Sequence, residues 1–304
     1  MPGHNGESNM TWTIVLAGGT GSRLADACRR RYGYARPKQF CDFDGNGTLL
    51  EHTLDRARAF SPSTRIVVVT ARAHRAEADE VLRDQGDLVR VEQPCPRDTT
   101  PAVSTGLLAV LARDPTAKVI VMPSDHHVAD GASFARALEQ ACAIVDSDPF
   151  GIALLGAVPE GPCDGYGWVV PQRTVGAESK VEQFCEKPSA AEAARLIDRG
   201  AVVNTLVTVA HATALVRALE QFSPVWWKLL AAEPDEATLE DAYAKLAGEN
   251  FSTDVLEHIP HLLRLVRLEA DAGWSDVGTP ARLDRVLAPM VTSLVRRGDL
   301  GAPP

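Results

Sequence analysis

The chain has 304 residues, a formal net charge of −9 and six cysteines scattered without a CxxC pair. This length allows one large α/β domain or two smaller ones, and the cysteine spacing favours free thiols over a zinc site or a disulfide scaffold. The acidic balance argues against binding to nucleic acid or to an anionic membrane, and no apolar run approaches the length of a membrane span.

The first stretch of interest is a predicted strand that leads into a glycine-rich turn. Residues 1–10 lack the regions of a signal peptide, so we expect a disordered leader and a cytoplasmic location. An apolar run over 13–16 then precedes three glycines and Arg23, with Lys38 downstream. Glycines let backbone N–H groups approach an anion, and the cations add contacts to phosphate oxygens. We therefore predict a nucleotide-phosphate site, although neither the Walker nor the dinucleotide glycine pattern fits. A plain strand-to-helix turn is the alternative.

The segment after this turn is basic and lacks an apolar period. Residues 25–36 contain four arginines and two tyrosines, which predicts a mobile basic flap beside the phosphate site or a solvated loop. Beyond it, apolar residues at helical spacing predict an amphipathic helix over 48–60.

Strands and helices then alternate. Apolar runs predict strands over 65–70, 88–92 and 118–122, and helices over 73–85 and 99–113 lie between them. Thr99 or Thr100 is expected to cap the second helix. This alternation predicts a doubly wound sheet with ligands at the carboxyl ends of its strands.

Asp125 follows the strand over 118–122, at the sheet edge where phosphates are expected. Phosphates would repel a carboxylate there unless a divalent cation lies between them, and Mg²⁺ is typically held by one or two carboxylates plus phosphate oxygens. We therefore predict Asp125 as a magnesium ligand; an N-cap for a helix starting near Gly131 is the alternative. His126 and His127 stay unassigned, because Mg²⁺ seldom uses imidazole and no zinc spacing accompanies them.

The second half predicts further strands, helices and a recognition set. The expected strands are 150–158, 168–171, 180–188, 201–210 and 262–268, and the expected helical stretches are 190–199, 221–250 and 279–297, the last exposed enough to be a dimer element. Glu186, Lys187 and Asn204 suit a hydroxylated, phosphorylated small molecule, although a solvated Glu–Lys pair is an alternative for the first two. Asp276 is the natural second carboxylate for the metal at Asp125.

Eight segments in order resemble the bacterial sugar-1-phosphate nucleotidylyltransferases, and most closely the mannose-1-phosphate guanylyltransferases. They are 16–24 (LAGGTGSRL), 36–40 (RPKQF), 97–102 (RDTTPA), 123–126 (PSDH), 165–167 (GYG), 184–188 (FCEKP), 204–207 (NTLV) and 274–278 (WSDVG). The resemblance implies an α/β, Rossmann-like, doubly wound fold with a mixed, mainly parallel sheet, the nucleotide-diphospho-sugar transferase fold. It implies one domain over 11–287, with a nucleotide-binding part over about 11–130, a sugar-binding part over about 150–278, and a helical tail over 288–304.

The reaction that the resemblance implies is an Mg²⁺-dependent transfer of a nucleotidyl group from GTP to mannose 1-phosphate or a close sugar 1-phosphate. The products are a GDP-sugar and pyrophosphate. Such chemistry depends mainly on positioning and charge neutralisation. Two alternatives stay open: the same reaction with dTTP, UTP, ATP or CTP and another sugar 1-phosphate, or a non-catalytic regulatory protein that binds nucleotide-sugars. A homodimer is possible, and neither nucleic acid nor membrane is an expected partner.

By the same resemblance, residues fall into four sets. The catalytic set is Arg23, Lys38 and Lys187. The nucleotide-binding set is Leu16, Ala17, Gly18, Gly19, Gly21, Ser22, Arg97, Thr99, Thr100, Pro123 and Ser124. The sugar-phosphate set is Gly165, Tyr166, Glu186, Lys187 and Asn204, and the metal set is Asp125 and Asp276. The chain departs from its relatives in three places: the segment 25–36, Leu206 in place of a glycine, and Asp98 in place of a frequent asparagine, which guanine's N–H donors would tolerate.

Overall fold

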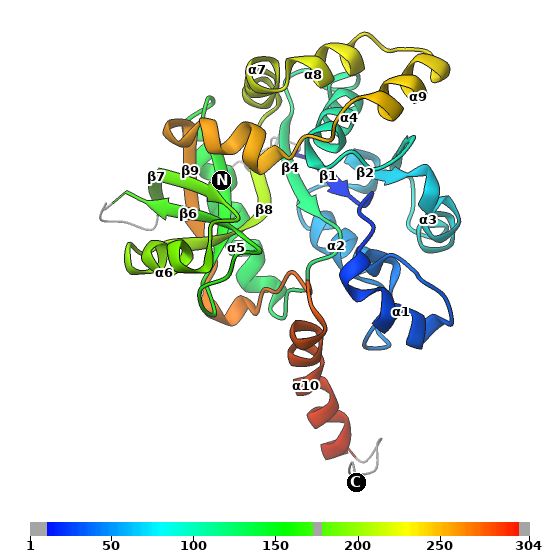
Figure 1. Cartoon of the computed structure of the whole chain (residues 1–304), viewed down its shortest axis with the longest axis vertical. Helices are drawn as coiled ribbons and strands as arrows, with labels where there is room; N and C mark the ends of the chain where they lie inside the picture. Colours follow the sequence, from blue (N-terminus) through cyan, green and yellow to red (C-terminus); the bar gives the residue numbers. More distant parts are fainter. Residues whose placement is uncertain (1–10, 173–177, 298–304) are drawn as a thin grey trace, which may run out of the picture.

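The computed structural model describes residues 11–172 and 178–297. Within these residues, nine strands form one sheet in the order β3-β2-β1-β4-β8-β5-β9-β7-β6 (Figure 1). The strands are β1 Trp12–Leu16, β2 Ile66–Ala71, β3 Val89–Gln93, β4 Lys118–Pro123, β5 Ile152–Ala157, β6 Gly167–Pro171, β7 Glu178–Glu186, β8 Val202–His211 and β9 Leu263–Arg267. The predicted leader and the last residues of the predicted tail lie outside the described residues.

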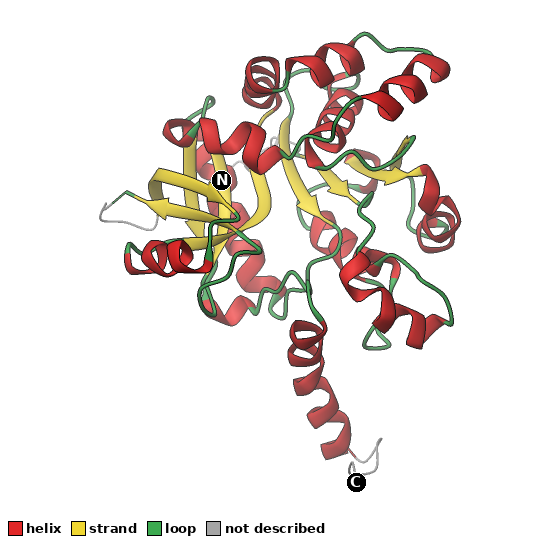
Figure 2. Cartoon of the chain, viewed as in Figure 1, coloured by secondary structure: helices red, strands yellow, loops and turns green. Residues whose placement is uncertain are grey.

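Helices cover both faces of this sheet (Figure 2). They are α1 Ala25–Tyr32, α2 Leu49–Arg58, α3 Arg75–Leu82, α4 Thr99–Leu111, α5 Gly131–Ser147, α6 Ala190–Asp198, α7 Ala212–Phe222, α8 Pro224–Ala231, α9 Glu236–Lys245 and α10 Pro280–Arg297. None of the described helices is long and apolar enough to cross a bilayer.

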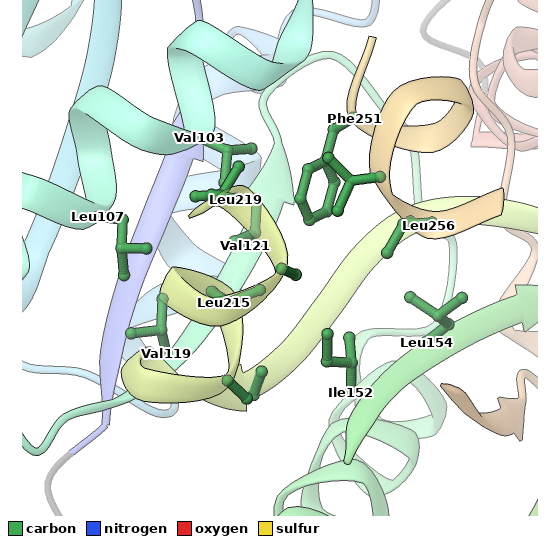
Figure 3. Packing of buried hydrophobic residues seen from close by; sticks show 14 of the residues in the cluster. Val103, Leu107, Val119, Val121, Ile152, Leu154, Leu215, Leu219, Phe251 and Leu256 are labelled. Atoms are coloured by element: carbon green, nitrogen blue, oxygen red, sulfur yellow. The ribbon is translucent and has the colours of Figure 1, made fainter. Parts of the chain in front are cut away.

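Alternating side chains of the strands bury two apolar cores. In β2, Val67 and Val69 belong to the core beneath α4 and α7, whereas Ile66 and Val68 belong to the core beneath α2, α3 and α5. Figure 3 shows the first core, where Val103 and Leu107 of α4 and Leu215 and Leu219 of α7 lie around β4. Burial on both faces explains why the central strands read as continuous apolar runs.

The strand order reverses between β1 and β4, and this reversal places the site. β1 pairs in parallel with β2 on one side and with β4 on the other, so that Leu16 lies opposite Pro123. Ligands of open α/β sheets bind in the crevice at such a reversal, beyond the carboxyl ends of the strands. The glycine turn after β1 and the Ser124-Asp125 segment after β4 therefore emerge side by side.

The predicted α/β fold with a mixed sheet is confirmed. Parallel pairing joins β1, β2, β3 and β4 and also joins β5 to β9, whereas β8 runs antiparallel to β4, β5 and β6. β8 thus connects the first half of the sheet to the second. The predicted long helical stretch over 221–250 is divided into the end of α7, α8 and α9.

Two local predictions were wrong. Part of the expected flap is helix α1, because Cys28 packs into an apolar cluster with Leu24, Cys41, Val277 and Leu283. Neither threonine caps α4: the N-cap is Asp98, whose carboxylate accepts a hydrogen bond from the Thr99 N–H at 2.8 Å. The N-cap of α5 is Asp130, which excludes the alternative that Asp125 caps this helix.

Candidate active site

A cavity of about 290 Å³ opens at the carboxyl ends of β1 and β4. Its lining residues are Leu16, Gly18, Gly19, Gln39, Gln93, Pro96, Asp98, Thr99, Ala102, Pro123, Ser124, Asp125, His126 and Leu206. Six residues of the predicted nucleotide set are among them. The other five members of that set, Ala17, Gly21, Ser22, Arg97 and Thr100, do not line this cavity.

Gln39 gives the glycine turn its shape. Its side-chain amide donates hydrogen bonds to the Ala17 carbonyl at 2.9 Å and to the Gly19 carbonyl at 2.7 Å. Gly21 has a φ of 58°, and a Cβ there would lie 2.8 Å from the Lys38 backbone nitrogen, so only glycine fits. The sequence motif contains Gln39, but only the fold reveals that it binds the turn.

A second set of contacts fixes the opposite wall of the cavity. Arg97 donates to the backbone carbonyls of Tyr243 and Ala244, so this side chain anchors the loop to α9 rather than facing the cavity. Asp98 accepts a hydrogen bond from the Asn250 amide at 3.1 Å, and Gln93 donates to the Tyr243 hydroxyl at 2.7 Å. Asp98 and Gln93 therefore stand as polar groups on this wall.

Lys38 contacts both predicted metal residues, Asp125 through its carboxylate and Asp276 through its backbone. Its ammonium lies 3.0 Å from Asp125 Oδ2 and donates to the backbone carbonyl of Asp276 at 2.5 Å. This side chain is buried, whereas Arg23 is exposed and makes no ion pair with any residue of 11–172 or 178–297. Lys187 is also exposed and lies 3.5 Å from Glu186 Oε1. Of the predicted catalytic cations, Lys38 is thus held in place and the other two are exposed side chains at the surface.

Both carboxylates are held in the ionised form. Burial opposes ionisation of Asp125, but Lys38 and then His126 hold the pKa of this carboxyl below its ordinary value. For Asp276, burial is outweighed by His126 and Arg282, and its pKa is again lowered. Burial is also the chief reason that the pKa of the His126 imidazole is lowered to about 4.

The Asp276 carboxylate is paired with an arginine that lies outside all the predicted motifs. Arg282, in the first turn of α10, donates to Asp276 Oδ1 at 3.0 Å and to Oδ2 at 3.1 Å. The Tyr166 hydroxyl donates to Oδ1 at 2.9 Å, and the Arg282 guanidinium also lies over the Tyr166 ring. Tyr166, placed by sequence in the sugar-phosphate set, is therefore a direct neighbour of the predicted metal carboxylate.

Glu186 and Asn204 both approach Gly167, a residue outside the predicted sugar-phosphate set. A Cβ on Gly167 would lie 2.4 Å from Glu186 Oε2 and 3.4 Å from the Asn204 Cβ, so a larger residue here would displace the Glu186 carboxylate. Gly165, the predicted residue, instead donates its N–H to Cys163 Sγ. Burial raises the pKa of the Glu186 carboxyl above its ordinary value.

Strained backbone gathers around these residues. Five described non-glycine residues have a positive φ, and four of them belong to the site segments: Asp98, Lys187, Leu206 and Val277. Asp98 and Leu206 line the cavity, Lys187 follows Glu186, and Val277 follows Asp276. Such conformations cost of order 1–3 kcal/mol each and concentrate at functional sites.

The two predicted metal ligands differ in how they could meet a hard divalent cation. Asp125 faces the cavity and offers carboxylate oxygens, which Mg²⁺ prefers. Asp276 has the second carboxylate, and its oxygens already accept hydrogen bonds from Arg282 and Tyr166. Lys38 contacts Asp276 only at the backbone carbonyl. A cation at Asp276 would therefore share or replace the Arg282 contact.

The fold is that of an α/β protein whose cavity lies at the reversal of strand order. The sequence profile described as nucleotidyl transferase matches residues 12–288. The chain belongs to this family, which confirms the resemblance seen in the sequence.

Curated relatives carry more specific names. Mannose-1-phosphate guanylyltransferase 2 of Escherichia coli O157:H7 is 29% identical over 309 residues, which cover 94% of this chain and 62% of that protein. Xanthan biosynthesis protein XanB of Xanthomonas campestris pv. campestris strain B100 is 29% identical over 277 residues, covering 88% of this chain and 57% of that protein. The chain thus spans about three-fifths of the length of these relatives.

A solved structure shares the fold over most of the chain. The crystal structure of mannose-1-phosphate geranyltransferase from Thermus thermophilus superposes with a TM-score of 0.79 at 29% identity. The match covers 92% of this chain and 79% of that one.

Proposed function

We propose that this chain transfers a nucleotidyl group from a nucleoside triphosphate, with GTP as the leading candidate, to mannose 1-phosphate or a close sugar 1-phosphate. The observation that carries the proposal is the position of Lys38, which contacts Asp125 and the Asp276 backbone beside a glycine turn at the strand-order reversal. This arrangement suits a triphosphate whose charge must be neutralised next to carboxylates. The names of the relatives support the choice of substrates.

In the proposed reaction, a phosphate oxygen of the sugar 1-phosphate attacks the α-phosphorus of the triphosphate. The bond from the α-phosphorus to the oxygen that bridges the α- and β-phosphates breaks, and pyrophosphate leaves. The backbone N–H groups of Gly18 and Gly19 and the side chain of Arg23 bind the triphosphate oxygens. Glu186 accepts hydrogen bonds from sugar hydroxyls, and Lys187 neutralises the sugar phosphate.

Asp125 and Asp276 would hold Mg²⁺, which when bound would neutralise charge on the phosphate oxygens. Lys38 keeps Asp125 ionised, so this carboxylate is ready to serve as a ligand at neutral pH. A cytoplasmic location and a homodimer are further parts of the proposal.

Two alternatives differ in measurable ways. The same reaction with another triphosphate keeps every role above and changes only the nucleotide base, which we place against Asp98 and Gln93. A non-catalytic nucleotide-sugar regulator would bind the product without turnover. The buried Lys38 and the ionised Asp125 favour the enzyme, because a regulator has no need to hold a triphosphate against a carboxylate.

One assay separates these three functions. The chain is mixed with Mg²⁺ and a panel of GTP, ATP, UTP, CTP and dTTP against mannose, glucose and heptose 1-phosphates, and pyrophosphate release is followed. We expect the highest kcat/KM with GTP and mannose 1-phosphate. Release with another pair would change the substrates, and no release with any pair, together with binding of a nucleotide-sugar in calorimetry, would overturn the enzyme in favour of the regulator.

A further inference from the structure

Two cysteine thiols that no proposed catalytic role uses lie in direct contact beside the site. The Cys41 thiol donates to the Cys28 sulfur, and the two sulfurs are 3.0 Å apart. Both side chains are fully buried in the apolar cluster that also holds Leu24, Val277 and Leu283. Cys28 lies in α1, and Cys41 follows the short helical turn Lys38–Phe40.

We propose that Cys28 and Cys41 form a reversible intramolecular disulfide, which makes this pair an oxidative modification site of the chain. An S–S bond of about 2.05 Å requires two sulfurs that already face each other, and this pair meets that requirement. The remaining described cysteines, Cys95, Cys142, Cys163 and Cys185, are free thiols with no such neighbour among the residues that the structure describes.

The surroundings identify Cys28 as the attacking sulfur. The hydrogen bond from Cys41 lowers the pKa of the Cys28 thiol against the opposing effect of burial, and Arg36 and Lys38 act in the same direction as the hydrogen bond. The same contact and burial raise the pKa of Cys41. Cys28 is therefore the thiol that loses its proton first, and Cys41 is the thiol that resolves the intermediate.

The oxidant in this proposal is a low-molecular-weight disulfide. The Cys28 thiolate attacks one sulfur of that disulfide and displaces a thiolate, which leaves a mixed disulfide on Cys28. Cys41 then loses its proton, attacks the Cys28 sulfur and displaces the second thiolate. Two protein thiols are oxidised, one small disulfide is reduced to two thiols, and the two protons pass to the released thiolates.

Access to the pair requires only that α1 opens. The helix has eight residues, and Cys28 is its only buried residue; Arg29, Arg30 and Arg31 are exposed. An element with so few buried apolar contacts opens locally at a small fraction of the cost of global unfolding. Opening of α1 therefore exposes the buried thiols while the sheet stays intact.

The disulfide would act on both cations of the triphosphate site. Cys28 follows Arg23 in the same short stretch of chain, and the backbone N–H of Cys41 donates to the Lys38 carbonyl at 3.0 Å. Bond formation draws these two segments together and displaces Lys38 from Asp125. A displacement of about 1 Å at a positioning group can lower turnover about 100-fold. This effect on turnover rests on the proposed function, whereas the disulfide itself does not.

The test uses the full chain and oxidised glutathione. After incubation, free thiols are alkylated in denaturant, the chain is digested with trypsin, and disulfide-linked peptides are identified by mass spectrometry. We expect the peptide 24–29 linked to the peptide 39–56, together with a loss of pyrophosphate release that dithiothreitol restores. Alkylation of both Cys28 and Cys41 under conditions that glutathionylate other cysteines would overturn the proposal.

Variants separate the two parts of the inference. Cys28→Ser and Cys41→Ser should each abolish the reversible loss of turnover, whereas Cys142→Ser, a change to a partly buried thiol in α5, should leave it intact. If the serine variants fold poorly, the peptide map of the unmodified chain still decides. A mapped Cys28–Cys41 link in a chain without transferase activity would overturn the proposed function alone.

Discussion

The Asp276 backbone accepts a hydrogen bond from Lys38, and its carboxylate accepts hydrogen bonds from Tyr166 and Arg282. The charge of this carboxylate is the property to test. We expect Asp276→Asn to lower kcat/KM for pyrophosphate release about 100-fold or more, because a neutral amide cannot balance a cation at the phosphates. The same change removes the partner of Arg282, and breaking such a buried pair costs about 3 kcal/mol of unfolding free energy. Circular dichroism should still show a folded protein.

A matched control is available nearby. Asp164→Asn makes the same charge change at an exposed residue, and kcat/KM should stay within twofold of the unmodified chain. Equal activities of the Asp276 and Asp164 variants would remove Asp276 from the site.

Glu186 gives a prediction about pH. Its pKa is raised by burial, so the folded state binds a proton more tightly than the unfolded state does. The unfolding free energy therefore falls as pH rises from the ordinary glutamate pKa of about 4.3 to the raised value. Above the raised value, the full cost of burying the ionised carboxylate is present. Lys187 is exposed and offsets little of it.

We accordingly expect Glu186→Gln to have a higher Tm than the unmodified chain at pH 7 and nearly the same Tm near pH 4. Its KM for the sugar 1-phosphate should rise about tenfold or more, because a sugar hydroxyl loses a charged acceptor. Scanning calorimetry across this pH range measures the first effect. A Tm difference that is zero or negative at pH 7 would show that burial does not destabilise this carboxylate.

The sequence motifs contain most of the residues that line the cavity, but they do not reveal the contacts of these residues. Gly18, Ser124 and Asp125 follow directly from strand ends, which are legible in the apolar pattern. The Arg282 contact with Asp276 depends on how α10 docks, and no spacing rule contains that information. Gly167 escaped for a similar reason, since its close approach to Glu186 exists only once β6 pairs with β7.

Among the helices, α2 has a complete capping box. Thr48 accepts a hydrogen bond from the Glu51 N–H at 3.2 Å, and the Glu51 carboxylate accepts one from the Thr48 N–H at 2.7 Å. Thr48→Ala should lower the unfolding free energy by about 1 kcal/mol, whereas Thr48→Ser should retain it. Urea titration measures both changes, and equal losses for alanine and serine would mean that the side-chain oxygen does not cap the helix.

The packing of α4 on β1 depends on Gly106. A Cβ there would lie 2.5 Å from Ile14 Cγ2 and 3.1 Å from Val69 Cγ2. Alanine gains about 1 kcal/mol in helix propensity, but overpacking a dense core costs about 1–3 kcal/mol. We expect a net loss of stability for Gly106→Ala in chemical denaturation.

Gly131, in the first turn of α5, provides the comparison. A Cβ at this position would meet no atom within 4 Å, so Gly131→Ala should be neutral or stabilising. If Gly106→Ala were as stable as Gly131→Ala, the core beneath α4 would have room that the structure does not show.

The sequence predicted those elements whose residues follow one clear periodicity, and it missed α1. In that helix three consecutive arginines face solvent and a single buried cysteine faces inward, so its apolar side is too narrow to be seen. The Asp98 cap was missed because threonine is also a good N-cap residue, and only the backbone conformation of the loop decides between them.

Because one continuous sheet runs through both parts of the described chain, we expect the two parts to unfold together. The cavity takes residues from β1, β4 and β8, which lie in adjacent positions of the sheet. A nucleotide that binds only the folded state at one hundred times its Kd should raise the unfolding free energy by about 2.7 kcal/mol. We expect a single unfolding transition that shifts as a whole when GTP and Mg²⁺ are added. Two transitions, with only one moving, would show that the halves unfold independently.

Helix α10 extends away from the body of the molecule (Figure 1), while its first turn holds Arg282 against Asp276. Eighteen residues make a rod of about 27 Å. The first turn of this helix contacts a carboxylate of the site, and the rest extends beyond it. A partner that bound the far end of α10 could tilt the helix, and the tilt would change the distance between Arg282 and Asp276.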